Sequence, residues 1–389
     1  MKKNRSVEFG FIGLGQAGGR IAAEATHLYQ YQSIAINSTN TDLEKLEISP
    51  KKKLLLQYGL EGAGKNLSFG RRAVEENRDV ILDFMRLHMT DGVEYSIGCY
   101  GNGGGSGGGG IVPLISIMRQ SELPIGLICT LPLESEDTIA KQNCVRTLKQ
   151  LDAIDDISPI IIVDNEKISK KYPNLSISQF WKRANHDVIQ TFHLFNMISS
   201  LNSEIHSYDM ADHQMVLRAG GCMTMGKAQI EGHHSKEVLA ENAKNAISTG
   251  LLADGFDLTT ARRVGIILRA TKKVLDRMKA TDLDYIFNYI RDVIQAGGIY
   301  RGVYSMEGQD ERIQIYSIFG GLDFPRERLG QLIDEARREV EIVSQKKKRS
   351  LDGDDPFNTD ALFDDQTDDD PLLDFIKKKT TKKKDGFWR

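Results

Sequence analysis

Short, almost wholly apolar runs alternate with longer segments of helical periodicity from the N-terminus to about residue 163. The runs that predict strands are 7–12, 33–36, 53–57, 95–99, 124–130 and 159–163. The segments that predict helices are 20–29, 69–88, 111–119 and 137–151. Apolar strands that alternate with helices are typical of a parallel sheet covered on both faces. We therefore expect an α/β domain in the first half of the chain.

The pattern changes after residue 177. Apolar residues recur at helical spacing through 178–200, which predicts a central, largely buried helix. Beyond it, strands at 220–230, 263–270, 299–305 and 312–319, helices at 236–248 and 276–295, and a charged helix at 325–345 predict a second, α+β part. The chain thus divides into a first domain (1–177), a central helix with its loop (178–219), a second domain (220–325), a C-terminal helix (326–345) and a tail (346–389).

The tail has a composition of its own. It opens with the basic run 346–349, carries ten Asp and no basic residue between 352 and 376, and ends with lysines at 377–379 and 382–384. Such a segment buries too little apolar surface to fold alone, so we expect it to be disordered.

Composition excludes several classes of protein. The 389 residues carry a net charge of −3, which argues against nucleic-acid binding over the whole surface. The four cysteines form no CxxC pair, as expected for thiols in a reducing cytosol. Glu8 and Gln16 interrupt the first apolar run, unlike a signal peptide, and no apolar run is long enough to span a membrane. We expect a cytoplasmic protein.

The most unusual stretch is Gly101–Gly110, in which eight of ten residues are glycine. It lies between a predicted strand and a predicted helix. Glycine lets backbone N–H groups approach a ligand, and the start of a helix adds free donors and a positive dipole end. The stretch therefore predicts a phosphate-binding loop. A flexible linker is the alternative.

Two further glycine loops follow predicted strands. Gly13–Gly19 matches the GxGxxG dinucleotide fingerprint, but Asn37 follows the second strand where that fingerprint has an acidic residue. Gly59–Asn66 is one residue short of a P-loop, and Asn66 lacks the Mg²⁺-binding hydroxyl. Because ligands bind at the carboxyl ends of parallel strands, we expect all three glycine loops around one crevice.

One pair of carboxylates follows the predicted central helix. Asp209 and Asp212 are three residues apart, a spacing that places them on one side of a helical turn. By spacing alone the ordinary interpretation is a solvated helix start, where acidic residues favour the dipole.

Taken in order, these stretches resemble the motifs of the tubulin/FtsZ superfamily. Gly103–Gly109 resembles the GGGTGTG/GGGTGSG signature, with Ser106 at the Thr position. The other matching stretches are 13–19, 35–37, 62–64, Pro132 with Glu136, 164–168, Phe180 with Ala184 and Asn185, and Asp209 with Asp212. Within the superfamily the chain most resembles the TubZ-type plasmid and phage segregation tubulins.

The resemblance implies a Rossmann-like GTPase domain that binds GTP or GDP, with Mg²⁺ held through phosphates and water and by no direct protein ligand. The residues it assigns to the nucleotide are Gly15, Gln16, Ala17, Gly18, Asn37, Ala63, Gly64, Gly103, Gly104, Gly105, Ser106, Gly107, Gly108, Pro132, Glu136, Asn165 and Asn185. Among these, the amides of Asn165 and Asn185 would meet the guanine. The resemblance gives Asp209 and Asp212 a catalytic role, in which they orient water at the nucleotide of the next subunit in a head-to-tail filament.

The chain departs from the FtsZ pattern at several positions. Ser207, Arg20 and Ala140 stand where FtsZ has Asn, Asn and Arg. The aspartate of its Asn-Thr-Asp loop corresponds to Thr39 or to Asp42, depending on the alignment frame. These departures concern mainly the contacts on the Mg²⁺ side.

Several functions remain open at this stage. The chain is expected to assemble with itself and to reach a DNA-bound adaptor through its tail, with no membrane partner, in plasmid or phage DNA segregation. The alternatives are an FtsZ-like cell-division filament, a non-hydrolysing scaffold that binds nucleotide and an NAD-dependent oxidoreductase. The tail itself is either a docking segment or a solubilising end.

Overall fold

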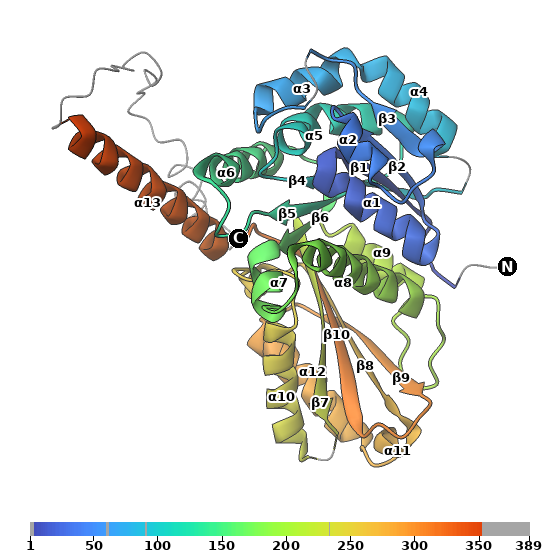
Figure 1. The fold of residues 1–389 in the computed structure, drawn as a ribbon. Coiled ribbons are helices and arrows are strands. Elements are labelled where there is room, and N and C mark those ends of the chain that lie inside the picture. The colour runs from blue at the N-terminus through green and yellow to red at the C-terminus, as the bar shows by residue number, and fades with distance from the viewer. Residues whose placement is uncertain (1–3, 60–61, 90–91, 233, 352–389) are drawn as a thin grey trace, which may run out of the picture.

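The computed structural model describes residues 4–59, 62–89, 92–232 and 234–351, and they form one ten-stranded sheet between helices (Figure 1). The strand order is β3-β2-β1-β4-β5-β6-β7-β10-β8-β9. The strands are β1 (Phe9–Leu14), β2 (Gln32–Asn37), β3 (Lys53–Leu55), β4 (Tyr95–Gly101), β5 (Ile125–Leu131), β6 (Ile157–Asp164), β7 (Cys222–Glu231), β8 (Arg263–Thr271), β9 (Ile299–Met306) and β10 (Arg312–Leu322).

The sheet is parallel through its first half and mixed in its second. Strands β3 to β7 pair in parallel, β10 runs antiparallel to both β7 and β8, and β8 and β9 are parallel. The two halves join where Ile160 and Ile161 of β6 pair with Cys222 and Met223 of β7. The α/β class expected from the sequence is confirmed.

Helices cover both faces of the sheet. In chain order they are α1 (Gly15–Tyr29), α2 (Asn40–Glu44), α3 (Leu67–Glu76), α4 (Arg78–His88), α5 (Gly105–Met118), α6 (Thr138–Asp152), α7 (Asn165–Lys171), α8 (Ile177–Ile198), α9 (Met210–Leu217), α10 (Lys236–Thr249), α11 (Lys272–Leu275), α12 (Ala280–Val293) and α13 (Arg326–Leu351). None of the described helices is both long and apolar enough to cross a membrane.

Two hydrophobic cores result from the alternation of side chains along the strands. Ile12 joins the core under α3, α4, α5, α6, α10, α12 and α13, whereas Phe11, one residue earlier, joins the core under α1, α7, α8 and α9. Both cores continue from the first half of the sheet into the second. The four cysteines are buried and free, as the sequence predicts.

Helix α8 is the central helix predicted over 178–200. Its expected core residues Val188, Phe192, Phe195 and Ile198 are at most 2% exposed. At 1.5 Å per residue, its 22 residues span roughly 33 Å. The helix can therefore connect the two ends of the parallel strands.

Several predicted helix boundaries differ from those observed. The helix expected over 69–88 breaks at Asn77, whose side-chain amide donates to the Ala73 carbonyl and ends α3. The segment expected to be helical over 276–295 is not one helix. It consists of residues 276–279, which connect α11 to α12, then α12 and two further residues. Helix α13 continues to Leu351 instead of ending at Gln345. The predicted tail beyond residue 351 lies outside the described residues.

The glycine run is mostly helical, not a linker, because α5 begins at Gly105. A Cβ on Gly109 would lie 2.1 Å from the Leu67 carbonyl oxygen, and one on Gly70 would lie 2.0 Å from the Gly105 carbonyl oxygen. Both distances are far below van der Waals contact. These glycines therefore let α3 pack backbone to backbone on α5, a requirement the sequence analysis did not anticipate.

Candidate functional site

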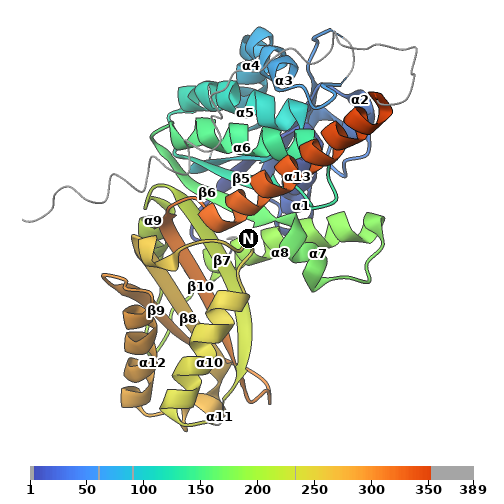
Figure 2. The same ribbon diagram turned by 90° about the vertical axis from the view of Figure 1, so that its left-hand side faces the viewer.

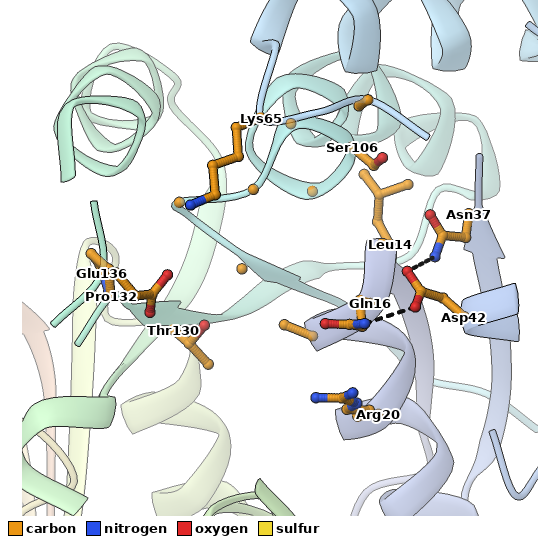
Figure 3. A pocket seen from close by; sticks show the side chains of 18 of the residues that line it. Leu14, Gln16, Arg20, Asn37, Asp42, Lys65, Ser106, Thr130, Pro132 and Glu136 are labelled. Carbon is orange, nitrogen blue, oxygen red and sulfur yellow. Dashed lines mark hydrogen bonds between the residues drawn. The ribbon is translucent and has the colours of Figure 1, made fainter. Parts of the chain in front are cut away.

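A cavity of about 360 Å³ opens at the carboxyl ends of the parallel strands (Figure 3). Of the residues that the sequence analysis assigned to a nucleotide, it is lined by Gly15, Gln16, Ala17, Asn37, Ala63, Gly64, Gly103, Gly104, Gly105, Ser106, Gly107, Pro132, Glu136, Asn165 and Asn185. The three glycine loops thus surround one crevice, as their positions after strands predicted. That these residues bind a nucleotide stays a prediction.

Two helix N-termini meet at one side of this cavity. Helix α1 begins at Gly15 and α5 at Gly105, and neither has a side-chain cap or an acidic residue in its first turn. A Cβ on Gly15 would lie 3.1 Å from the Gly107 nitrogen, so the two helix starts touch. The first N–H groups of a helix have no partner within the helix. Paired, uncapped N-termini make this side of the cavity suited to the phosphates of a nucleotide.

Asp42 lies in the cavity, where it joins two of the loops. Its carboxylate accepts a hydrogen bond from Gln16 Nε2 at 2.7 Å and from Asn37 Nδ2 at 3.4 Å (Figure 3). Thr39 instead serves as the N-cap residue of α2 and does not line the cavity. Of the two alignment frames left open by the sequence, the structure brings Asp42 to the site.

Lys65 lines the opposite part of the cavity, from the loop that leads into α3. Its ammonium group lies 2.6 Å from Asp137 Oδ2, and this hydrogen bond lowers the pKa of the Asp137 carboxyl. By sequence, Gly59–Asn66 is one residue short of a P-loop, and no role was assigned to its lysine. Its position after two glycines was the available signal.

The far end of the cavity carries amides, an aromatic ring and a turn. Asn165 begins α7 and is buried, while Trp181 and Asn185 lie one turn apart on α8. Glu136 Oε1 accepts a hydrogen bond from the Leu133 N–H at 2.9 Å, which closes the turn that carries Pro132. This end offers polar groups for the edge of a base and an apolar ring for its face. Trp181 was missed because it fits the buried-helix pattern.

Two expected residues, Gly18 and Gly108, do not line the cavity. A Cβ on Gly18 would lie 1.9 Å from the Cys99 carbonyl oxygen, and one on Gly108 would lie 2.7 Å from that of Asn102. Both glycines are buried against neighbouring backbone. Their lack of a side chain allows this close packing, and their contact with a nucleotide stays a prediction.

Asp209 and Asp212 lie at the other end of the sheet. The end of α9, which follows them, is held at the Leu217 carbonyl by Ser158 Oγ, at the beginning of β6. The cavity, in contrast, lies where the parallel strands end. Neither carboxylate lines it. These acids therefore serve no group in the cavity of their own chain.

The two carboxylates form a capping box at the start of α9. Asp209 Oδ1 accepts from the Asp212 N–H at 2.9 Å, and Asp212 Oδ2 accepts from the Asp209 N–H at 3.3 Å. Burial and the neighbouring Asp209 charge raise the pKa of Asp212, although its hydrogen bond to the Asp209 backbone lowers it. The helix-start interpretation from spacing is thus confirmed, and one oxygen on each carboxylate is left out of the box.

Aromatic residues behind the acids fix the backbone of this loop. The Tyr304 hydroxyl accepts a hydrogen bond from the Tyr208 N–H at 2.9 Å and donates to the Tyr208 carbonyl at 3.2 Å. The Tyr208 ring is fully buried, and its hydroxyl lies 3.2 Å from His213 Nδ1. Tyr208 directly precedes Asp209. The strand β9 therefore holds the residue next to the first acid at both of its backbone polar groups.

The cavity suits a nucleotide with its ion better than an ion alone. The described residues include no group of three His, Cys, Asp or Glu side chains that could cage a metal. Mg²⁺ commonly keeps several waters and bonds phosphates with one or two carboxylates. The uncapped N-termini suit the phosphates through which such an ion would be held.

Two family models cover most of the chain. Residues 8–173 match the model described as "Tubulin/FtsZ family, GTPase domain". Residues 194–333 match the model described as "Tubulin/FtsZ-like protein TubZ-like, C-terminal domain". The first range contains the whole cavity except Trp181 and Asn185, and the second contains the acidic pair.

Individual proteins agree with these models. The chain is 24% identical to the tubulin-like protein TubZ of Bacillus cereus, over 94% of this chain and 90% of that protein. It is 28% identical to the tubulin-like protein CetZ of Pyrococcus abyssi, over 80% of this chain and 84% of that protein. A crystal structure of a GTPγS-form protofilament of Bacillus thuringiensis serovar israelensis TubZ has a TM-score of 0.76 at 20% identity, covering 88% of this chain and 95% of that one.

Proposed function

The chain belongs to the tubulin/FtsZ family and carries its GTPase domain, and on this premise we propose that it hydrolyses GTP within head-to-tail filaments. The observation that carries the proposal is the separation of the two candidate site regions. The cavity lies at one end of the parallel strands, and the acidic pair lies at the other. A repeated contact between these two ends joins each cavity to the acids of the next subunit and generates a filament.

The cavity residues bind and position the nucleotide in this proposal. The N–H groups at the starts of α1 and α5 hold the phosphates, with Lys65 adding a positive charge. Asn165 and Asn185 pair with the guanine edge, and Trp181 covers its face. A base that leaves buried amides unpaired is rejected strongly, so GTP is preferred over ATP.

Asp209 and Asp212 act on the nucleotide of the neighbouring subunit. One oxygen of each carboxylate, Asp209 Oδ1 and Asp212 Oδ2, maintains the capping box. The other oxygen of each accepts a hydrogen bond from the attacking water. Phosphoryl transfer requires mainly positioning and charge stabilisation, so orientation of water by two carboxylates is a sufficient role. Mg²⁺, when bound, would neutralise phosphate charge and would be held through phosphates and water. The family's structures include TubZ filaments, described as two-stranded and four-stranded helical models, which supports assembly.

The rate of GTP hydrolysis at increasing protein concentration tests this proposal. Because each complete site needs two subunits, turnover per subunit should rise steeply through a threshold concentration and then level off. Sedimentation of polymer should begin at the same concentration. A turnover number that does not depend on protein concentration would contradict catalysis between subunits.

We propose DNA segregation as the cellular role of these filaments. The support is the TubZ-like C-terminal model and the likeness to a structure described as a type III plasmid segregation TubZ, with a TM-score of 0.72 at 20% identity. In this proposal the tail beyond residue 351 docks on a DNA-bound adaptor, with its acidic block facing basic surface. Co-sedimentation of adaptor-loaded DNA with filaments of the full chain and of a chain ending at Leu351 tests this role. Equal recovery of DNA would exclude docking through the tail.

A further inference from the structure

We propose that Arg328 of α13 is a positioning residue for the nucleoside end of the cavity, an inference that rests on the proposed GTP-binding function. Helix α13 packs across α6 and begins beside the end of β6 (Figure 2). Arg328 lies in its first turn and is 4% exposed. The side chains it contacts lead, through a closed ring of polar groups, to both loops that surround the nucleoside.

The first half of the ring consists of charged side chains. Arg328 Nε donates to Asp164 Oδ2 at 2.8 Å, and Arg328 Nη1 donates to Glu335 Oε1 at 3.1 Å. Lys141 Nζ of α6 lies 3.7 Å from Glu335 Oε2. The side chains of Arg328, Asp164 and Lys141 are 5%, 3% and 1% exposed. One guanidinium group thus bridges the end of β6 and the third turn of α13.

The second half of the ring passes through the two nucleoside loops. Lys141 Nζ donates to the Glu134 carbonyl at 2.7 Å, in the loop that carries Pro132. The Glu134 N–H donates to Glu166 Oε2 at 3.0 Å, and the Glu166 N–H donates to Asp164 Oδ1 at 3.0 Å. Asp164 therefore closes the ring. None of these described ring residues lines the cavity itself.

Asp164 is the residue through which Arg328 acts. It is the N-cap of α7, and the next residue, Asn165, begins that helix and lines the cavity. The direction of the Asn165 amide depends on how this cap is held. Arg328 holds one carboxylate oxygen of Asp164 while the other caps α7. The position of α13 therefore affects the direction of the Asn165 amide, which contacts the base in the proposed complex.

Stability alone does not account for this ring. Arg328 Nη2 and Glu335 Oε2 are buried without a hydrogen bond among the described residues. Burial also raises the pKa of Asp164 in spite of the nearby guanidinium. A buried ion pair often stabilises a protein no better than apolar residues of the same volume. These charged groups are explained if they fix the loop that carries Pro132 relative to the start of α7.

The test compares affinity for GTP, for ATP and for tripolyphosphate in the full chain and in Arg328→Met. GTP and ATP differ only at the base, whereas tripolyphosphate probes only the phosphate end. We expect Arg328→Met to lower the GTP-to-ATP affinity ratio about tenfold and to leave tripolyphosphate affinity within about twofold of wild type. Arg326→Ala, at the start of the same helix, removes a partly exposed ion pair with Asp323 of the preceding loop; it is the matched control and should change neither affinity.

Two further variants keep the test decisive if Arg328→Met loses stability, since it leaves the buried Asp164 carboxylate without its cation. Glu335→Gln keeps the Arg328–Asp164 pair but weakens the link to Lys141, and it should lower the ratio about threefold. In Arg328→Met with Asp164→Asn the α7 cap is retained without a buried charge. Because Arg328 acts through Asp164, the GTP-to-ATP affinity ratio of this double variant should be no lower than that of Arg328→Met alone.

The outcomes separate this inference from the proposed function. Wild-type protein that binds GTP and ATP equally would overturn the proposed base contacts and the inference with them. Wild-type protein that prefers GTP, together with Arg328→Met that prefers it equally, would overturn the positioning role alone. A parallel loss of tripolyphosphate affinity would also overturn it, because it would show general damage to the cavity.

Discussion

The cavity and the loop that carries Asp209 and Asp212, here called the acidic loop, lie at opposite ends of one sheet. The two regions are built in different ways. The phosphate side of the cavity consists of backbone: uncapped helix starts and glycines that allow helices to touch. The acidic loop consists of side chains that hold one another, in a capping box and a tyrosine contact to the backbone. An added Cβ where two helices touch forces their backbones apart, whereas a side-chain site can be altered one functional group at a time.

This difference has a consequence for how each region responds to mutation. Substitutions at the glycines where α3 and α5 touch, Gly70 and Gly109, should abolish binding and folding together. Substitutions in the acidic loop should separate hydrolysis from binding. The following expected outcomes, from the largest effect to the smallest, either sharpen this contrast or remove it.

Gly109→Ala should produce the largest effect. Its Cβ would lie 2.1 Å from the Leu67 carbonyl oxygen, so α3 must move away from α5. We expect a destabilisation of about 3 kcal/mol or more and loss of measurable GTP binding. Thermal unfolding and nucleotide titration measure both. Gly330→Ala is the matched control, because a Cβ there meets nothing within 4 Å in a helix, and it should be neutral or slightly stabilising.

Asp209→Asn should reduce GTP turnover by about a hundredfold or more while leaving GTP affinity unchanged. Asparagine caps a helix about as well as aspartate, so α9 should keep its start and only the charge should be lost. Turnover, nucleotide affinity and polymer sedimentation are the measurements. Asp257→Asn, at another N-cap, serves as control. Normal turnover in Asp209→Asn would leave the carboxylate with its capping role alone.

Low pH should reduce the free energy of unfolding through His213, which contacts Tyr208 behind the acidic loop. Burial lowers the pKa of His213 to about 3, against 6.5 for a free imidazole. Between these values the unfolded chain binds the extra proton, so stability falls as pH drops below about 6.5. At pH 5 the loss should be about 2 kcal/mol.

Urea unfolding at pH 7.5 and pH 5 measures this effect, and His213→Gln should show a smaller difference between the two. Burial also lowers the pKa of His193, to about 4, which leaves part of the acid sensitivity in that variant. The exposed His27 provides the control, since His27→Gln should respond to pH like wild type. An unchanged pH response in His213→Gln would exclude the histidine as the cause.

Tyr304→Phe should have the smallest effect, a threefold to tenfold loss of turnover with unchanged GTP affinity. It removes one hydroxyl that bonds both backbone groups of Tyr208, and such bonds contribute about 0.5–1.5 kcal/mol each. Tyr316→Phe is the control, because that hydroxyl donates to Gln314 within β10, away from the acids. If Tyr304→Phe and Tyr316→Phe turn over GTP equally, the tyrosine contact does not position the acidic loop.

Much of the fold and of the cavity could be predicted from the sequence, because both depend on local pattern. Apolar runs of strand length, separated by helical segments, are sufficient to predict the parallel half of the sheet. Once the strands are parallel, their following loops must lie at one edge, so Gly15, Ala63 and Gly104 could be placed together without coordinates. That Asp209 and Asp212 lie at the start of a helix could likewise be predicted from their spacing, whereas the capping box between them came from the structure.

Tertiary structure alone decided which groups meet across long distances in the chain. Gly18 and Gly108 fit the loop motifs, yet neighbouring backbone occupies the space that a side chain at either position would need. Asp42 reaches the cavity only because β2 and α1 are adjacent. Arg328 meets Asp164 across 164 positions, and no local periodicity encodes that pairing. A sequence pattern specifies which face of an element is buried, but the partner on that face is set by how whole elements pack.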